Sequence, residues 1–223
     1  MGTLYVVATP IGNLEDITLR AIRILQEADL IACEDSRITK RLLVRHEIDT
    51  PTISYHQHSG EEKTAVLLEK LRAGQSIALV TDAGTPGIQD PGGRLVRAVR
   101  NAQISVEVIP GPSALTAALS VAGISADSFY FVGFLPKKKG RQTLLKELER
   151  LAIPIVIYEA PPRVVKTLRD IHAYLGERKI IAARELTKKF EELQEGTVTS
   201  LLNHFTNHRP KGEFVIIVLP DIY

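Results

Sequence analysis

A loop rich in glycine and proline, at residues 81–93, is the part of the sequence whose residue types point most directly to ligand chemistry. It contains Asp82, four glycines and two prolines, whereas one glycine and one proline are enough to reverse a chain. The surplus predicts a backbone that approaches a ligand closely. The carboxylate of Asp82, at the end of an apolar strand, would suit a cationic or hydroxyl-bearing ligand. A tight structural loop is the alternative interpretation.

The same loop argues against two common nucleotide sites. It lacks the Gly-x-Gly-x-x-Gly pattern of dinucleotide folds, and it lacks the Gly-Lys-Ser/Thr ending of a phosphate-binding P-loop. We therefore expect neither NAD nor ATP as the ligand.

Basic residues form three clusters that could neutralise the phosphates of a nucleic acid. The strongest has four positive charges within residues 137–141 and no acid between them. The third is followed by Glu191, Glu192 and Glu195, so a self-neutralising surface is its alternative interpretation. The clusters are Arg37, Lys40, Arg41 and Arg45; Lys137, Lys138, Lys139 and Arg141; and Arg184, Lys188 and Lys189.

Alternating apolar strands and amphipathic helical patterns indicate which elements must position these residues. The alternation predicts an α/β protein with a mainly parallel sheet in the first half and a mixed sheet in the second. Three strands of the first half lead into loops that begin at Thr9, Thr81 and Pro110. Because parallel strands end at one edge of a sheet, the loops should line one pocket, mainly with backbone. We place the domain boundary between residues 1–112 and 113–223.

The charge balance and the cysteine and histidine content limit the classes of partner. The 223 residues carry 28 basic and 26 acidic side chains, so a nucleic acid would have to be met by local patches. The single cysteine, Cys33, excludes an internal disulfide. The pairs His56 with His58 and His204 with His208 have neither a suitably spaced glutamate nor a third ligand, and we expect no metal site.

No apolar stretch is long enough to span a membrane, and no leader pattern precedes the first strand. We therefore expect a soluble, cytoplasmic protein without a membrane partner.

Seven motifs, spread in order over nearly the whole chain, resemble those of the ribosomal RNA small subunit methyltransferase I family, within the tetrapyrrole methylase superfamily. They are ATPIGNL at residues 8–14, CEDSR at 33–37, TDAGTPGIQDPGG at 81–93, PGPSALTAA at 110–118, GFLP at 133–136, ARELTKKFEE at 183–192 and KGE at 211–213.

This resemblance implies a two-domain, class III methyltransferase, usually a homodimer, that holds S-adenosylmethionine in the cleft between its domains. It also implies 2′-O-methylation of a cytidine in the decoding region of 16S ribosomal RNA, with the small ribosomal subunit as partner. The residues that it assigns to the cofactor are Pro10, Asp82, Gly84, Thr85, Ser113, Ala114, Tyr158, Arg184 and Gly212. The basic residues of the sequence, and not the resemblance, supply the candidates for RNA contacts: Arg37, Lys40, Arg41, Lys137, Lys138, Lys139, Arg141, Arg163 and Lys188.

A ribose hydroxyl is a poor nucleophile at neutral pH, so the implied reaction gains from a base that accepts its proton. Glu34, Asp35 and Glu185 are the candidate catalytic residues, and Glu159 is a further candidate carboxylate. Glu34 and Asp35 directly precede the basic residues near Arg37, which would place a carboxylate beside RNA-binding charge. A helix cap or a salt bridge is the alternative role for each of these carboxylates.

Two other functions fit parts of the sequence. A methylase of a small tetrapyrrole or of a modified protein residue would not need the basic loop at 137–141. A non-enzymatic RNA-binding assembly factor would keep the fold without chemistry. Cofactor binding separates the two methylases from the assembly factor, and salt-dependent RNA binding separates the RNA methylase from the small-molecule methylase.

Overall fold

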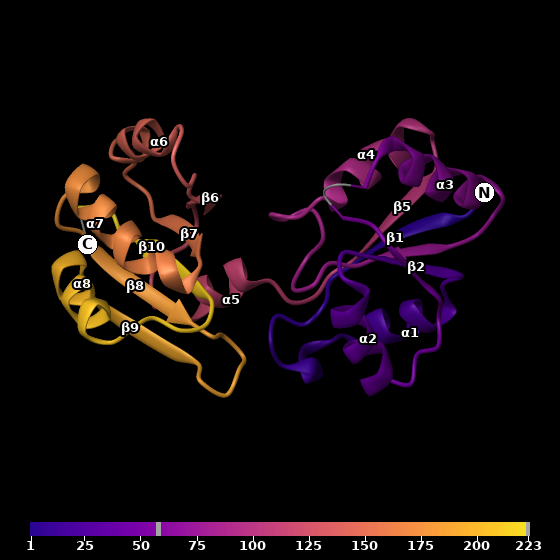
Figure 1. Ribbon diagram of the computed structural model, residues 1–223, viewed down its shortest axis with the longest axis horizontal. Coiled ribbons are helices and arrows are strands. Elements are labelled where there is room, and N and C mark those ends of the chain that lie inside the picture. The colour runs from indigo at the N-terminus through magenta and orange to yellow at the C-terminus, as the bar shows by residue number, and fades with distance from the viewer. Residues whose placement is uncertain (57–58, 222–223) are drawn as a thin grey trace. The chain divides into compact units, whose positions relative to one another are not determined.

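The computed structural model of the protein describes residues 1–56 and 59–221, and its contacts divide the chain into two units (Figure 1). These units are Met1–Ser113 and Ala114–Tyr223, a division one residue from the boundary expected above. Each unit contains one five-stranded sheet.

The sheet of the first unit is parallel at each of its strand pairings, as the alternation of strands and helices predicts. Its order places β1 between β4 and β5, with β2 beside β4 and β3 at the far edge. In sheet order the strands are β3 (Thr52–Ser54), β2 (Leu30–Cys33), β4 (Ile77–Leu79), β1 (Thr3–Val7) and β5 (Ser105–Ile109).

Both faces of this sheet are buried, because successive strand residues belong to two different cores. In β2, Ile31 and Cys33 pack with the first pair of helices, α1 and α2. Leu30 and Ala32 pack with the second pair, α3 and α4. A strand that is apolar on both faces is typical of a parallel sheet covered by helices. The helices are α1 (Leu19–Glu27), α2 (Ser36–Arg45), α3 (Glu61–Arg72) and α4 (Gly92–Asn101).

The second unit contains a mixed sheet. β6 and β7 pair in parallel, whereas β7 with β10, β10 with β8, and β8 with β9 pair antiparallel. One large core joins this sheet to α6, α7 and α8, and α5 packs against β10. The elements are α5 (Ala114–Val121), β6 (Tyr130–Phe134), α6 (Arg141–Leu148), β7 (Ile155–Glu159), α7 (Val164–Leu175), β8 (Lys179–Arg184), β9 (Glu192–Thr197), α8 (Val198–Asn207) and β10 (Phe214–Val218).

β9 begins within the charged segment at residues 184–195. Its side chains alternate between half-buried and exposed positions, and it pairs only with β8, at the edge of the sheet. Glu195 is exposed, and charged residues on an edge strand discourage pairing with another chain. The polar composition of the strand makes its two-residue alternation hard to recognise in the sequence.

In the described part of the chain, no helix combines the length and the apolar character that crossing a bilayer requires.

Candidate active site

Three strand-end loops of the first unit are joined into one structure at the carboxyl edge of its sheet. The amide of Thr9 donates to the carbonyl of Gly84 at 2.9 Å, and the amide of Gly84 donates to the carbonyl of Thr9 at 3.0 Å. The hydroxyl of Thr85 donates to the carbonyl of Pro112 at 3.2 Å. The predicted convergence of these loops is therefore confirmed.

The local structure requires glycine at some positions of the 81–93 loop but not at all of them. Gly84 has a φ of +83°, in the left-handed region that favours glycine. At Gly92, a Cβ would lie only 2.9 Å from the Oδ1 atom of Asp90. At Gly93, by contrast, a Cβ would meet nothing within 4 Å. The structural interpretation accounts for Gly84 and Gly92, whereas Gly93 borders open space and close approach to a ligand stays a prediction there.

Two carboxylates beside this loop, those of Glu34 and Asp82, have raised pKa values. Burial, followed by the charges of Asp82 and Asp90, raises the pKa of Glu34. Burial also raises the pKa of Asp82, although its Oδ1 atom accepts a hydrogen bond from the amide of Asp35 at 3.0 Å. Each negative charge makes the ionisation of a neighbouring carboxyl group less favourable, so a ligand that brings a positive charge or a hydroxyl donor would be favoured here.

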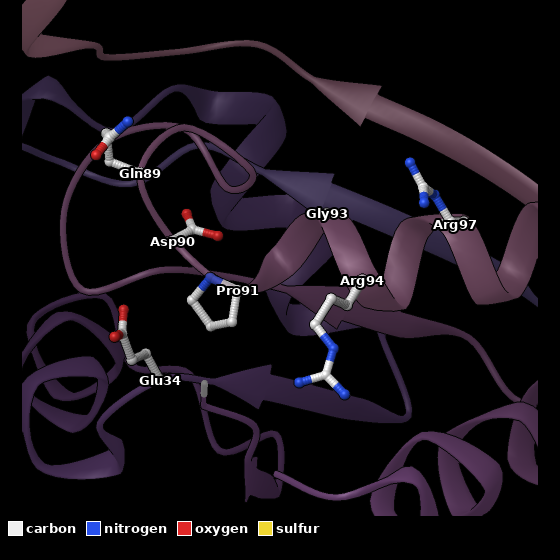
Figure 2. Close-up of a pocket in the computed structure, with 7 residues that line it drawn as sticks. All are labelled: Glu34, Gln89, Asp90, Pro91, Gly93, Arg94 and Arg97. Carbon is white, nitrogen blue, oxygen red and sulfur yellow. The ribbon is translucent and has the colours of Figure 1, made fainter. Parts of the chain in front are cut away.

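Glu34 faces an open cavity of about 620 Å³ (Figure 2). Arginines from α4 line the same cavity, and Figure 2 shows Arg94 across from Glu34 with Arg97 further along the helix. The Oδ2 atom of Asp90 is buried and has no hydrogen-bond partner among the described residues. A carboxylate, an unused acceptor and guanidinium groups thus meet at one cavity. Its lining residues are Glu34, Gln89, Asp90, Pro91, Gly93, Arg94 and Arg97.

Asp35, the neighbour of Glu34 in the sequence, has a different environment. Its side chain caps α2 by accepting from the amide of Arg37 at 2.9 Å, and it pairs with the guanidinium of Arg37 at 2.5 Å. These bonds lower the pKa of Asp35 to about 2, which makes it a weak base. The helix-cap role, rather than catalysis, describes Asp35.

Glu185 has the salt-bridge role. Its Oε1 atom accepts from the ammonium of Lys188 at 2.9 Å and from the amide of Glu213 at 2.9 Å. Burial alone would raise the pKa of Glu185, but the Glu213 amide and Lys188 outweigh it, and the pKa is lowered. Gly212 presses against this side chain, because a Cβ there would lie 2.3 Å from the Cγ atom of Glu185.

Glu159, the further candidate base, is a structural residue. Its side chain is fully buried and pairs with Arg163 at 3.1 Å. It also accepts from the hydroxyl of Thr167 at 2.5 Å. These contacts leave Glu34 as the candidate base that faces a cavity.

Arg141 corrects one RNA-binding assignment. Its guanidinium pairs with Asp170 at 2.7 Å, donates to the hydroxyl of Thr167 at 2.9 Å and donates to the carbonyl of Pro136 at 3.2 Å. The side chain is only 5% exposed, because α6 begins at this residue and turns it into the core. The run of four basic residues is therefore a surface of three lysines, Lys137, Lys138 and Lys139, followed by a buried arginine.

The other residues assigned to RNA differ in how far they are already engaged. Lys40 and Arg41 are exposed on α2, as is Arg37. Arg163 donates to the carbonyl of Leu135 besides its pair with Glu159. Lys188 bridges Glu185 and Glu213. The exposed residues remain the better candidates for phosphate contacts.

The residues assigned to the cofactor lie in both units. Pro10, Asp82, Gly84 and Thr85 belong to the joined loops, and Ser113 and Ala114 lie where α5 begins. In the second unit, the ring of Tyr158 contacts Phe131 and Phe134, with ring centroids 4.9 and 5.8 Å apart. Arg184 pairs with Glu192 at 2.9 Å and donates to the carbonyl of Lys211 at 2.6 Å.

The arginines of α4 are the site residues that the sequence analysis missed. Arg94 and Arg97 line the cavity, but their charges are separated by apolar residues and do not form a run. Their three-residue spacing, in an amphipathic helix directly after the glycine loop, is the sequence feature that could have identified them as site residues.

Of the histidines considered above, His58 lies outside the described residues. His204 and His208 stack with ring centroids 4.7 Å apart. Within residues 1–56 and 59–221, no group of three or more His, Cys, Asp or Glu side chains could hold a metal ion.

Comparison with known proteins gives consistent matches. The family model for Tetrapyrrole (Corrin/Porphyrin) Methylases matches residues 3–202. The chain is 52% identical to Ribosomal RNA small subunit methyltransferase I of Synechocystis sp., over 98% of this chain and 79% of that protein. It is 43% identical to the protein of the same name from Thermotoga maritima, over 98% of both chains.

Solved structures of other methylases share the fold. The crystal structure of diphthine synthase superposes with a TM-score of 0.77 at 14% identity, covering 99% of this chain and 90% of that one. Uroporphyrin-III C-methyl transferase from Thermus thermophilus, complexed with S-adenyl homocysteine, gives a TM-score of 0.67 at 22% identity, covering 97% of both. At these identities the likeness concerns the fold alone.

The buried role of Arg141 predicts a large effect on stability. Arg141→Met should lower the free energy of unfolding by roughly 3 kcal/mol, because removing one partner leaves buried polar groups unpaired. Lys138→Met removes the same charge from an exposed position and should change stability little. Urea denaturation of the two variants measures the difference, and equal effects would show that Arg141 is not a structural residue.

The contact between Gly212 and Glu185 predicts a second difference. Gly212→Ala and Gly123→Ala both place a side chain on left-handed backbone, at φ values of +78° and +65°. Only at Gly212 would the new Cβ strike a side chain, since nothing lies within 4 Å at Gly123. Thermal unfolding should therefore show a larger loss for Gly212→Ala, beyond the roughly 1 kcal/mol expected from left-handed backbone. A smaller loss of thermal stability for Gly212→Ala than for Gly123→Ala would contradict the close contact between Gly212 and the side chain of Glu185.

Proposed function

The chain belongs to the ribosomal RNA small subunit methyltransferase I family of the tetrapyrrole methylases, and we propose that it 2′-O-methylates a cytidine in the decoding region of 16S ribosomal RNA. The methyl donor is S-adenosylmethionine, and the partner is the small ribosomal subunit. The observation that carries the proposal is Glu34, a carboxylate with a raised pKa that faces a cavity bordered by arginines.

The residues at the carboxyl edge fit such a cofactor. The carboxylate of Asp82 follows β4 and suits hydroxyl or ammonium donors, and the joined loops offer backbone atoms for close approach. We assign Pro10, Asp82, Gly84 and Thr85 to cofactor binding on this basis. The assignment of Ser113, Ala114, Tyr158, Arg184 and Gly212 rests on the family.

When bound, S-adenosylmethionine supplies an electrophilic methyl group. The contribution of this chain is to align the ribose hydroxyl for in-line displacement and to accept its proton. Glu34 is the proposed base, because a carboxylate with a raised pKa takes up a proton more readily than one at its ordinary value. Arg94 and Arg97, on the opposite side of the cavity, would hold the phosphates next to that ribose.

The cellular location and assembly follow from the family. We place the protein in the cytoplasm, where small ribosomal subunits are modified, and expect a homodimer. Sedimentation of the purified protein at micromolar concentration measures its assembly, and a monomer under these conditions would contradict that expectation.

Transfer of labelled methyl from S-adenosylmethionine to small subunits that lack the modification tests the proposal directly. We expect the label on the ribose of a cytidine. Cofactor binding by calorimetry without label on RNA would favour a small-molecule or protein acceptor. Absence of both would favour the assembly-factor alternative.

The proposed base predicts both a rate and a pH profile. Glu34→Gln should lower kcat by about 10² to 10⁴-fold and leave cofactor affinity unchanged. Because the base acts only when ionised, activity of the unmodified protein should fall with decreasing pH through a pKa above the ordinary 4.5 of a glutamate. Asp35→Asn serves as the control, since Asp35 does not line the cavity. Its charge is the smallest of the causes that raise the pKa of Glu34, so this variant should stay active and its pH profile should move only slightly, toward lower pH. If Glu34→Gln kept full activity, the base would have to be another group.

A further inference from the structure

A groove runs along α4, built from three adjoining hollows. The cavity at Glu34 shares Gly93 and Arg97 with a second hollow of about 540 Å³. The second hollow shares Arg100 with a third of about 720 Å³, which reaches Ser105 at the start of β5. The groove therefore extends from the carboxyl edge of the sheet to its amino edge.

The charge along this groove is positive except at one end. Arg94, Arg97 and Arg100 are exposed at three-residue intervals, which places them about 4.5 Å apart along the helix axis. Arg97 and Arg100 form no ion pair with any residue in the described ranges. The acids that line the groove, Glu34 and Asp90, lie only in the first hollow.

This arrangement distinguishes between possible occupants. Guanidinium groups bind phosphates through paired hydrogen bonds, and a row of them suits a chain of phosphates better than a single nucleotide. An acidic peptide would also suit the arginines, but its carboxylates would be repelled by Glu34 and Asp90. An RNA strand carries phosphates for the arginines and a ribose hydroxyl for Glu34, so it matches both ends.

We propose that Arg94, Arg97 and Arg100 of α4 bind the sugar–phosphate backbone of a single-stranded RNA segment and lead it to Glu34. This inference rests on the proposed function, because it takes Glu34 as the end of the track. It adds a third basic surface to those of α2 and of the lysines at 137–139, and it gives α4 a role in positioning the RNA.

The test compares two double variants with matched chemistry. Arg97→Gln with Arg100→Gln removes two charges of the groove. Arg20→Gln with Arg23→Gln removes two exposed arginines, also three residues apart, from α1 on the opposite face of the sheet. This control matches the number and spacing of the charges, although Arg23 pairs with Glu27 and Arg20 donates to the carbonyl of Val108. The probe is a synthetic RNA with the sequence of the 16S decoding region, and its affinity is measured at several salt concentrations.

The groove variant should bind the RNA at least 10-fold more weakly than the unmodified protein. The slope of log affinity against log salt should decrease by about 1.4, because each phosphate contact to a single strand contributes about 0.7. The α1 variant should keep the original affinity and slope, and both variants should keep cofactor affinity and the thermal midpoint. An unchanged slope in the groove variant, or an equal loss in both variants, would overturn the proposal. So would a change of oligomeric state confined to the groove variant, because a second copy of the chain would then be the occupant.

The methyl-transfer assay separates this proposal from the proposed function. Suppose that the unmodified protein methylates small subunits and that the groove variant binds RNA with the same affinity as the unmodified protein. RNA binding by the groove is then refuted, and the proposed function stands. If only the groove variant loses RNA binding, but the unmodified protein transfers no methyl group, RNA binding by the groove stands and the proposed methylation is refuted. If the unmodified protein methylates small subunits but does not bind the synthetic RNA, the proposed single-strand site is wrong and the function stands. If it neither binds the RNA nor methylates small subunits, both are wrong.

Discussion

The parallel pairing of β1 with β4 on one side and β5 on the other is the constraint on which the site of the first unit depends. It brings the loops after these three strands to the same edge, where the reciprocal amide bonds between Thr9 and Gly84 join two of them. β4 is buried and β1 is buried or half-buried along its length, as a central position between two helical layers requires, whereas β5 forms the edge of the sheet with Glu107 and Val108 exposed. The position of Asp82 is thus a consequence of core packing some distance away.

The same edge shows how neighbouring carboxylates acquire opposite properties. Glu34 and Asp35 are adjacent in the sequence, yet the pKa of one is raised and that of the other is lowered to about 2. Glu34 is half-buried near Asp82 and Asp90, whereas Asp35 points into the amino terminus of α2 and meets Arg37. The guanidinium of Arg37 and, after it, the backbone amide at the start of α2 lower the pKa of Asp35, whereas burial raises that of Glu34.

Much of this organisation could be predicted from the sequence, because it depends on local patterns. Apolar runs gave the parallel strands, and the glycine-rich loop gave the position of Asp82. What could not be predicted depends on contacts between distant residues. Arg141 is buried by Asp170 and Thr167 of α7, and no pattern within residues 137–141 indicates that it turns inward while its lysine neighbours stay exposed. The edge strand β9 has a polar composition that does not indicate a strand, and its antiparallel pairing with β8 makes it one.

The arginines of α4 show that a basic surface can form without a run of basic residues in the sequence. A search for contiguous charge finds Lys137, Lys138 and Lys139, but a helix distributes its charges at intervals of three or four residues, so a basic track on a helix contains no basic run. The apolar residues between the arginines, Leu95 and Val99, are buried against the sheet and fix the face that the arginines present. The burial of one face of α4 and the positive charge on its other face therefore come from the same amphipathic pattern. The core that packs α4 against the sheet also orients the groove that leads to Glu34.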